Sequence, residues 1–506
     1  MALGIQWLVF SAAVFLYPFI IVLYRLYFHP LAKFPGPKIA AATGWYETWI
    51  DLFQRPRGNF MEEITRMHDK YGPIVRINPH EIHIRDSTWI DTLYSGPKHG
   101  QRDKYPPTAY MTGTPKGIFG TVSHDLHRQR RAAINPLYSK ANAGATAPLF
   151  YDNVELLLER MDDQIARGEP AEMRTSYLAL ATDNVSEHST GLSRSLLRKE
   201  QEAVLWRQSI KTLAEWTLIG RHFSWVIPFV LKMPILPLRM VLPDFARIVG
   251  LHRVNTYIQH QHLAEKARDA QNVFQMALSN PNLPESEKVF NRISHEGVVA
   301  IAAGGETTAR ALTVATFFLL RNEREHLQRL EQELKYVMPD DSSRPSVREL
   351  ERLPWLTAII KESLRIMALP TTRFPLVASK EALRYKDWVI PENTPVSMTI
   401  REVLLDRDIF ENPSEFQPER WLSTNPNLEK LNHYFVPFGR GNRMCIGINL
   451  AWAELYITLA SLFRRRKLQL YDTLRERDID VARDCFIGET SPNTKGVRVI
   501  YEKATV

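Results

Sequence analysis

Cys445 has the surroundings best suited to chemistry in this chain. It lies in the segment Phe438–Gly447, which reads FGRGNRMCIG, so that glycines let the backbone turn tightly around a lone thiol. The aliphatic run that follows predicts a helix over 448–462. A thiolate at the start of a helix is stabilised by the unpaired N–H groups and the positive end of the helix dipole. A haem iron uses one such thiolate as its protein ligand, whereas the alternative is an inert cysteine in a tight turn.

A second chemically suggestive segment is Ala303–Thr308, which reads AGGETT inside an apolar run that predicts a buried helix over 296–320. Adjacent glycines inside a helix cost about 1 kcal/mol each relative to alanine, so their presence needs a reason. They let a flat ligand approach the backbone closely. A threonine hydroxyl can also bond the carbonyl four residues back and help to bend the helix. The segment therefore indicates either a ligand groove beside Glu306 and Thr307 or a simple glycine kink.

A third pattern places Glu362 and Arg365 three residues apart, on one face of a predicted helix. Alone, such a pair is usually a surface salt bridge that contributes little. Arg420 follows downstream in the sequence Pro-Glu-Arg-Trp, ahead of the cysteine segment.

Phe438, Gly441, Arg443, Cys445 and Gly447 match the pattern Phe-x-x-Gly-x-Arg-x-Cys-x-Gly, which closely resembles the cysteine loop of the cytochrome P-450 family. The resemblance implies that the Cys445 thiolate binds the iron of haem b, with the other four residues in the cofactor-binding loop. It also implies a mainly α-helical cytochrome P-450 fold with small peripheral β-sheets.

The same resemblance gives roles to the other two patterns. Thr307 is expected to order water near bound dioxygen, and Glu306 to relay protons. Glu362, Arg365 and Arg420 are expected to form a buried charge network that supports the thiolate side of the fold. Removing a member of such a network leaves uncompensated buried charge, at a cost of about 3–5 kcal/mol.

The two haem propionates need cations. Arg443 is the first candidate from its place in the loop, and Arg373 matches the family's arginine after the Glu-x-x-Arg helix. Arg131 and His127 are further candidates from the pattern Trp-x-x-x-Arg, in which this chain has histidine in place of tryptophan. A solvated helix face is the alternative for these basic residues, including His127 and Arg443.

The N-terminus predicts a membrane segment. Ile5–Tyr24 is free of charged residues and has about the length that crosses ~30 Å of hydrocarbon. Basic residues follow it, so the positive-inside rule places the rest of the chain in the cytosol. We expect a single-pass anchor in the endoplasmic reticulum membrane over 1–24, a basic, proline-rich hinge over 25–40 and one catalytic domain over 41–506. A cleaved signal peptide is the alternative.

Composition excludes several classes of protein. Apolar residues make up 44% of the 506 residues, enough for a large core, which excludes global disorder. The chain has two cysteines, Cys445 and Cys485, so a disulfide scaffold is excluded and a reducing compartment fits. The net charge of +8 is spread along the chain without a nucleic-acid motif. The basic run 464–467 is either a solvated face or part of a surface that docks an acidic electron-transfer partner.

Periodicity predicts helices over 151–166 and 323–337, and β-branched alternation predicts short strands around 74–78, 81–84, 381–389 and 497–501. These elements agree with the α-rich fold that the resemblance implies.

The expected activity is that of a haem-thiolate monooxygenase that inserts one atom of O2 into a lipophilic small molecule. Its electrons are expected from NADPH-cytochrome P-450 reductase, because the chain carries no flavin or nicotinamide motif. The segment Tyr27–Pro37 resembles fungal secondary-metabolic members of the trichodiene-oxygenase-like group, which implies a terpenoid substrate. A polyketide or alkaloid substrate, a reductase-independent haem-thiolate isomerase or dehydratase, and a cysteine hydrolase stay open as alternatives.

Overall fold

The computed structural model of the chain describes residues 16–94, 100–243, 246, 249 and 272–501. It is mainly helical, as the sequence predicts. Its longer helices are α4 (Phe60–Tyr71), α7 (His124–Ile134), α9 (Ala147–Ala166), α10 (Met173–Thr190), α11 (Glu200–His222), α16 (Phe290–Arg321), α17 (Gln328–Val337), α19 (Pro354–Met367) and α22 (Ile448–Arg465).

The remaining helices are short and connect these elements. They are η1 (Tyr24–Phe28), α2 (Lys38–Ala42), α3 (Trp45–Leu52), η2 (Ser87–Trp89), α5 (Ile90–Leu93), α6 (Pro106–Tyr110), η3 (Asn135–Tyr138), α8 (Lys140–Ala145), α12 (Val226–Lys232), α13 (Ile235–Val241), α15 (Val273–Ser279), η4 (Glu285–Glu287), η5 (Glu323–Leu327), α18 (Val347–Leu350), α20 (Ile400–Leu404), η6 (Pro418–Trp421), α21 (Leu428–His433), η7 (Gly441–Arg443) and α23 (Arg475–Asp478).

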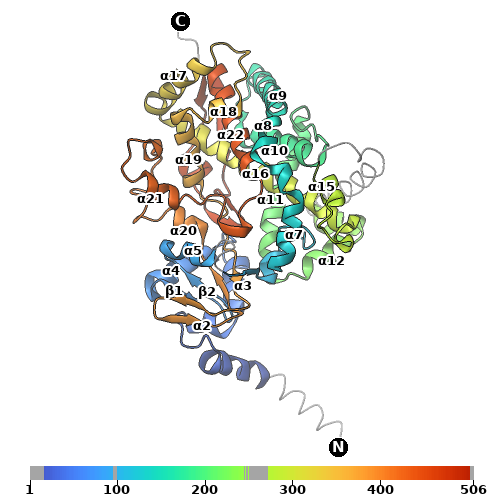
Figure 1. Cartoon of the computed structure of the whole chain (residues 1–506), viewed down its shortest axis with the longest axis vertical. Helices are drawn as coiled ribbons and strands as arrows, with labels where there is room; N and C mark the ends of the chain where they lie inside the picture. The colour runs from blue at the N-terminus through green and yellow to red at the C-terminus, as the bar shows by residue number, and fades with distance from the viewer. Residues whose placement is uncertain (1–15, 95–99, 244–245, 247–248, 250–271, 502–506) are drawn as a thin grey trace, which may run out of the picture.

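The main core surrounds α16. This helix is buried over most of its length because its sequence is apolar on nearly every face, and it packs against α10, α19 and α22. It begins at Phe290, six residues before the predicted start at 296. α22 begins at Ile448 as predicted, three residues after Cys445. Figure 1 shows these helices in the half of the molecule opposite the N-terminus.

A five-stranded sheet forms the other half, in the order β1-β2-β8-β5-β3. β2 pairs in parallel with β8, and the other neighbours pair antiparallel; Lys104 of β3 lies opposite Leu376 of β5. Figure 1 shows β1 and β2 near the N-terminal end, beside α2 and α4. The strands of this sheet are β1 (Ile74–Arg76), β2 (Ile82–Ile84), β3 (Asp103–Lys104), β5 (Leu376–Val377) and β8 (Pro395–Ser397).

The other strands form small peripheral sheets, as expected. The predicted strand around 381–389 is a hairpin, because Lys386 takes a positive φ of 51° and reverses the chain. The three-stranded sheet has the order β4-β12-β9. The strands are β4 (Ala171–Glu172), β6 (Leu383–Tyr385), β7 (Trp388–Ile390), β9 (Leu468–Leu470), β10 (Arg483–Cys485), β11 (Ile487–Glu489) and β12 (Arg498–Tyr501).

The predicted membrane segment Ile5–Tyr24 lies largely outside the described residues. Residues 16–23 are helical and continue into η1. In the described part of the chain, we find no helix long and apolar enough to cross a bilayer. Part of the predicted hinge packs against the sheet half of the molecule. Leu31 and Phe34 are buried there, and the Phe34 ring stacks on Trp388 of β7 with the ring centroids 4.9 Å apart.

Candidate functional site

The cysteine segment folds into a tight loop that ends at α22. Gly439 and Gly441 both have a φ of 72°, in the left-handed region that glycine adopts without a steric penalty. The Cys445 backbone N–H donates to the Phe438 carbonyl at 2.8 Å and closes the loop. The segment therefore holds Cys445 just ahead of a long helix, as its sequence predicts.

The Cys445 side chain is accessible, and the surrounding loop partly desolvates its thiol. Burial raises the pKa of the thiol, while a hydrogen bond from the backbone of Gly447 and the charge of Arg131 oppose the increase. Without a metal the sulfur is thus held as a thiol. A bound metal ion would remove the proton, because a coordinated thiol is deprotonated.

Two of the predicted cofactor-binding cations gather beside this loop. Arg131, on α7, donates to the Met444 carbonyl at 2.5 Å. Arg443 donates to the carbonyls of Thr121 and Val122 at 2.8 and 2.6 Å, and its Nε is buried without a hydrogen-bond partner in the described residues.

The charges of Arg443 and Arg131 also act on His127, which lies on α7. Burial, followed by those two charges, lowers the pKa of His127 to about 2. Its imidazole is therefore neutral at physiological pH and keeps one N–H group that can donate.

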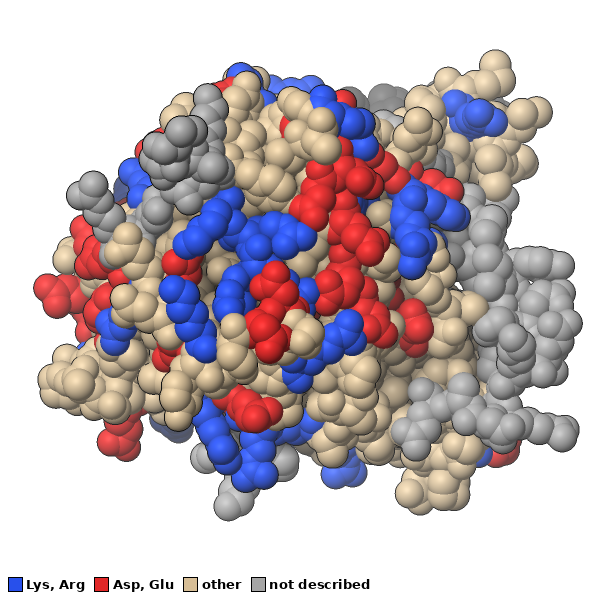
Figure 2. Space-filling view, turned by 90° about the horizontal axis from the view of Figure 1, so that it is seen from above, with Lys and Arg blue, Asp and Glu red and all other residues tan. Residues whose placement is uncertain are grey.

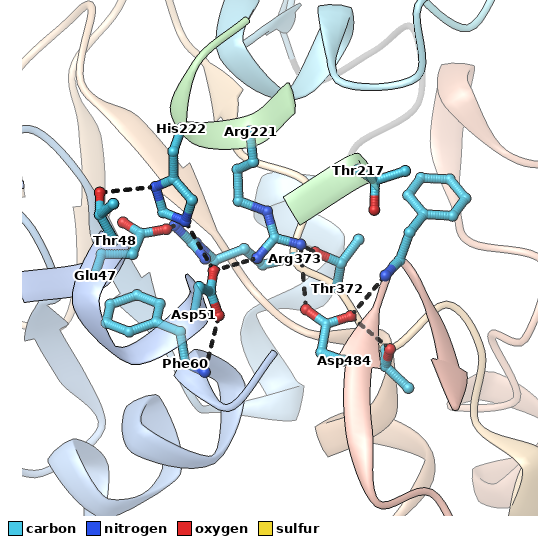
Figure 3. A network of polar contacts seen from close by, with 12 residues as sticks. Glu47, Thr48, Asp51, Phe60, Thr217, Arg221, His222, Thr372, Arg373 and Asp484 are labelled. Atoms are coloured by element: carbon cyan, nitrogen blue, oxygen red, sulfur yellow. Dashed lines mark hydrogen bonds and ion pairs between the residues drawn. The ribbon is translucent and has the colours of Figure 1, made fainter. Parts of the chain in front are cut away.

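Arg373, the remaining predicted cofactor-binding cation, lies among carboxylates. Its guanidinium forms ion pairs with Glu47 at 2.6 Å and Glu81 at 2.8 Å, and all three side chains are buried. Figure 3 shows Arg373 beside Glu47 within a larger polar network. Only Nη1 of Arg373 lacks a partner in the described residues, so its predicted role toward the cofactor rests on that atom.

The same network contains Glu47, Asp51 and His222, whose ligand atoms lie within 4.8 Å of one another. Arg373 neutralises Glu47, and Arg221 pairs with Asp51 at 3.2 Å, so the carboxylates already have cationic partners (Figure 3). We interpret this cluster as an ion-pair network and not as a metal site.

On α16 the two predicted catalytic residues, Thr307 and Glu306, lie in different surroundings. The Thr307 hydroxyl donates to the Ala303 carbonyl at 2.8 Å, and both residues are accessible in the middle of a helix that is otherwise largely buried. The Glu306 carboxylate is buried and accepts from Nε of Arg174 at 2.9 Å. Arg174, at the start of α10, also pairs with Glu489 at 3.3 Å. Burial would lower the pKa of Arg174, but these carboxylates raise it above its ordinary value.

Glu362, Arg365 and Arg420 come together as the resemblance implies. Nε and Nη2 of Arg365 donate to the two carboxylate oxygens of Glu362 at 2.9 and 2.7 Å, and both side chains are fully buried. Arg420 donates to Glu362 at 3.3 Å, and the Trp421 indole donates at 2.9 Å. The network thus joins α19 to η6.

The comparisons with known proteins agree with this geometry. The family model for cytochrome P450 matches residues 42–493. The chain belongs to the cytochrome P450 family. It is 38% identical to the cytochrome P450 monooxygenase sdnE of Sordaria araneosa, over 94% of both chains. It is 38% identical to the tryptophan 6-hydroxylase fscE of Fusarium equiseti, over 96% of this chain and 95% of that protein. It is 33% identical to the cytochrome P450 monooxygenase TRI4 of Trichoderma arundinaceum, over 94% of this chain and 91% of that protein.

Cytochrome P450 enzymes are oxidoreductases that carry haem b on a cysteine thiolate, and the residues of this structure fit that group. The accessible thiol of Cys445 would supply the thiolate that holds the iron. The adjacent cations Arg131 and Arg443 match a cofactor that carries two carboxylates. The buried Nε of Arg443, which has no partner among the residues that the structure describes, is a donor that such a carboxylate would satisfy.

The basic run 464–467 is balanced by acidic partners. Arg465 pairs with Glu155 at 2.6 Å, Arg466 with Asp162 at 2.6 Å and Lys467 with Glu331 at 2.5 Å. Figure 2 shows positive and negative side chains interleaved over the face seen from above. These ion pairs argue against a basic docking surface, and the Arg465 side chain, 5% exposed, is not part of a solvated face either.

Sequence reasoning missed Arg174 and Lys104. Arg174 reaches Glu306 across more than a hundred residues of sequence, and Lys104 lies in a charged stretch that resembles a surface loop. Lys104 is nevertheless buried, and its charge acts on His127. No local pattern marks either residue, because both contacts depend on the tertiary fold.

Proposed function

We propose that this protein is a membrane-anchored haem-thiolate monooxygenase that inserts one atom of O2 into a lipophilic small molecule, a terpenoid intermediate of fungal secondary metabolism. The observation that carries the proposal is the accessible thiol of Cys445 beside the cations Arg131 and Arg443, neither of which forms an ion pair with a carboxylate in the described part of the chain. When bound there, haem supplies the reductive activation of dioxygen and the transfer of oxygen to the substrate.

The chain's own residues hold the cofactor and move protons. Cys445 would ligate the iron, and Arg131, His127 and Arg443 would hold the propionates. The Thr307 hydroxyl donates its hydrogen bond to the Ala303 carbonyl, so its oxygen is available to accept a hydrogen bond from a water molecule. Thr307 would therefore hold a water molecule in place for proton delivery.

A proton-relay role for Glu306 must account for the hydrogen bonds that its carboxylate accepts from Arg174. A relay role for Glu306 needs this carboxylate to exchange Arg174 for water during turnover. Arg174 can release it without becoming unpaired, since Glu489 lies 3.3 Å from the same guanidinium.

The decisive test is the spectrum of the reduced, carbon monoxide-bound protein. We expect a strongly red-shifted Soret band that is lost in Cys445→Ala, because the shift requires a thiolate ligand. Cys485→Ala is the matched control, since Cys485 is buried and away from any ligand motif. An unshifted band in the unmodified protein would contradict thiolate ligation.

The terpenoid substrate is supported by the relatives. TRI4 and a conidiogenone synthase of Penicillium rubens, 34% identical over 95% of this chain, lie among them. The tryptophan 6-hydroxylase favours an indole as the competing substrate class. Incubation with NADPH, a reductase and either a terpene alcohol or an N-acyl tryptophan separates the two by which compound gains an oxygen atom. Conversion without NADPH would instead indicate the isomerase or dehydratase alternative.

The electron donor that we propose is NADPH-cytochrome P-450 reductase on the endoplasmic reticulum membrane. The uncharged segment Ile5–Tyr24 supports anchoring there, and exposed apolar side chains continue along the described helix at Tyr17, Phe19 and Ile20. α3 adds Trp45 and Trp49, which are 64% and 59% exposed. Retention in the membrane after alkaline carbonate extraction tests the anchor, and recovery in the supernatant would contradict it.

A further inference from the structure

Arg76 of β1 is a buried arginine whose hydrogen bonds do not account for its charge. Its side chain is 1% exposed, and Nη1 and Nη2 donate to the carbonyls of Arg25 and Pro79, each at 2.8 Å. Its Nε is buried and has no partner among the residues that the structure describes. Neutral donors could satisfy the same two carbonyls, so the burial of a full positive charge needs another explanation.

The titratable side chains around Arg76 are also basic. Arg25 donates through Nη1 to the Ala42 carbonyl at 3.0 Å, and the ring centroids of His29 and His80 lie 6.0 Å apart. Burial lowers the pKa of His29 to about 4, and the charges of its three basic neighbours add to the decrease. In the described part of the chain, no ion pair joins these four residues to a carboxylate. We call Arg25, His29, Arg76 and His80 the basic cluster.

The basic cluster offers hydrogen-bond donors to a ligand from solvent. Nδ1 of His29 accepts from the Leu31 backbone N–H at 3.1 Å, so the neutral imidazole carries its hydrogen on Nε2. Arg25 and His29 are half-buried and His80 is exposed, whereas Arg76 is buried. An anion could therefore reach the first three side chains and be stabilised by the charge of the fourth. Arginine donors match the oxygens of a phosphate group especially well.

The position of the basic cluster favours a lipid as the source of that phosphate. Arg25 comes directly after the uncharged segment Ile5–Tyr24. Figure 1 shows the described N-terminal helix extending from the end of the molecule that carries α2 and β1. Tyr24 and Tyr27 of η1 are exposed, and tyrosine is enriched at the level of the lipid headgroups. Basic residues at this level also attract anionic lipids.

We propose that the basic cluster binds the phosphate group of an anionic membrane lipid. Arg25, His29 and His80 would donate hydrogen bonds to the phosphate oxygens, and Arg76 would supply the buried positive charge that stabilises the bound anion. The inference rests on the proposed function only through its membrane anchor, which brings the cluster to the lipid surface. Free inorganic phosphate has the same acceptor oxygens and is the competing source.

The test is native mass spectrometry of the full-length holoprotein, titrated in detergent micelles with phosphatidic acid. It compares Arg25→Gln and His80→Gln with the control Lys38→Gln, which removes an exposed charge from the same hinge. We expect each cluster variant to weaken binding of the first lipid at least about tenfold, because a hydrogen bond to a charged group is lost. Lys38→Gln should change the Kd less than about twofold.

Each result decides the question. Equal weakening in Lys38→Gln would show that binding follows the total charge of the hinge, and unchanged binding in either cluster variant would exclude the site; both overturn the proposal. Displacement of the lipid by an equal concentration of inorganic phosphate would assign the site to free phosphate and also overturn it. If Arg25→Gln does not fold, His80→Gln alone decides. The carbon monoxide band and carbonate extraction test the proposed function separately from these results.

Discussion

Two threonines of α16 make the same local hydrogen bond in different surroundings. Thr307 donates to Ala303 at 2.8 Å and Thr313 donates to Ala309 at 2.7 Å, but only Thr307 is accessible. Their effects on helix geometry should therefore be alike, and the difference between them isolates the role of the accessible hydroxyl.

We expect Thr307→Ala to lower product formation by roughly 10²-fold, the low end of the contribution of positioned proton transfer, while oxygen is still consumed. The electrons should then appear as hydrogen peroxide, because the proton that completes the reaction is delivered late. Coupling of NADPH oxidation to product measures this effect. Thr313→Ala is the matched control, and equal uncoupling in both variants would assign the effect to the helix.

Glu454 is a single buried carboxyl that should make stability depend on pH. It is 2% exposed, and burial raises its pKa to about 7 from 4.5, although Asn184 donates a hydrogen bond to it. The folded protein therefore binds this proton more tightly than the unfolded chain does. Its contribution is favourable below about pH 4.5 and is lost as the pH rises to about 7.

Glu454→Gln should remove this loss of stability at higher pH, because the amide keeps an acceptor for Asn184 and carries no charge. At pH 4.5 we expect the variant to have nearly the same unfolding free energy as the wild-type protein. At pH 8 we expect its unfolding free energy to be higher than that of the wild-type protein by up to about 3 kcal/mol. Urea unfolding at both values measures the gain. Glu159→Gln, at an exposed position of α9, should show no difference between them.

At the scale of elements, the Glu362 carboxylate on α19 connects this helix to η6 through hydrogen bonds and ion pairs. It accepts from Arg365, Arg420 and the Trp421 indole, and also from the Gln417 backbone N–H at 3.0 Å. Glu362→Ala would leave buried guanidinium groups without a partner.

We expect Glu362→Ala to lose about 3–5 kcal/mol of unfolding free energy and to be recovered without haem. The urea midpoint and the ratio of Soret to protein absorbance measure the two effects. Glu285→Ala removes an exposed i,i+3 partner of Lys288 and should change stability by less than about 1 kcal/mol. Full haem content in Glu362→Ala would contradict the expectation.

The elements also show how far the sequence could predict the site. Local patterns were sufficient for the cysteine loop and the long helix after it, because glycine positions and apolar periodicity act within a few residues. The pairing of Glu362 with Arg420 required the family resemblance, since Glu-x-x-Arg alone is common. The partners of Arg373 and Glu306 could not be predicted, because Glu47, Glu81 and Arg174 approach them from distant parts of the chain.

At the scale of the whole molecule, the network in Figure 3 joins three separate segments. Arg221, at the end of α11, pairs with Asp51 of α3 and with Asp484 of β10, both at 3.2 Å. His222 adds a contact to Asp51 at 3.0 Å. The helical half of the molecule is thereby held to the sheet half through buried charge.

Arg221→Met should cost about 3–5 kcal/mol, because it leaves two buried carboxylates with less compensation. Urea unfolding followed by circular dichroism measures the loss. Arg167→Met provides the control, since the ion pairs of Arg167 with Glu169 and Glu200 in the described part of the chain are exposed. An equal loss in both variants would show that the network adds nothing to an ordinary surface pair.

The cations around the cysteine loop have a consequence beyond catalysis. The positive charges of Lys104, Arg131 and Arg443 all act on His127, so a dianionic cofactor bound among them would stabilise the folded chain. A ligand that binds only the folded state stabilises it in proportion to the logarithm of its concentration. The abundance of this protein in a cell should therefore follow haem supply. Iron starvation would remove the protein through degradation and leave no reserve of inactive enzyme.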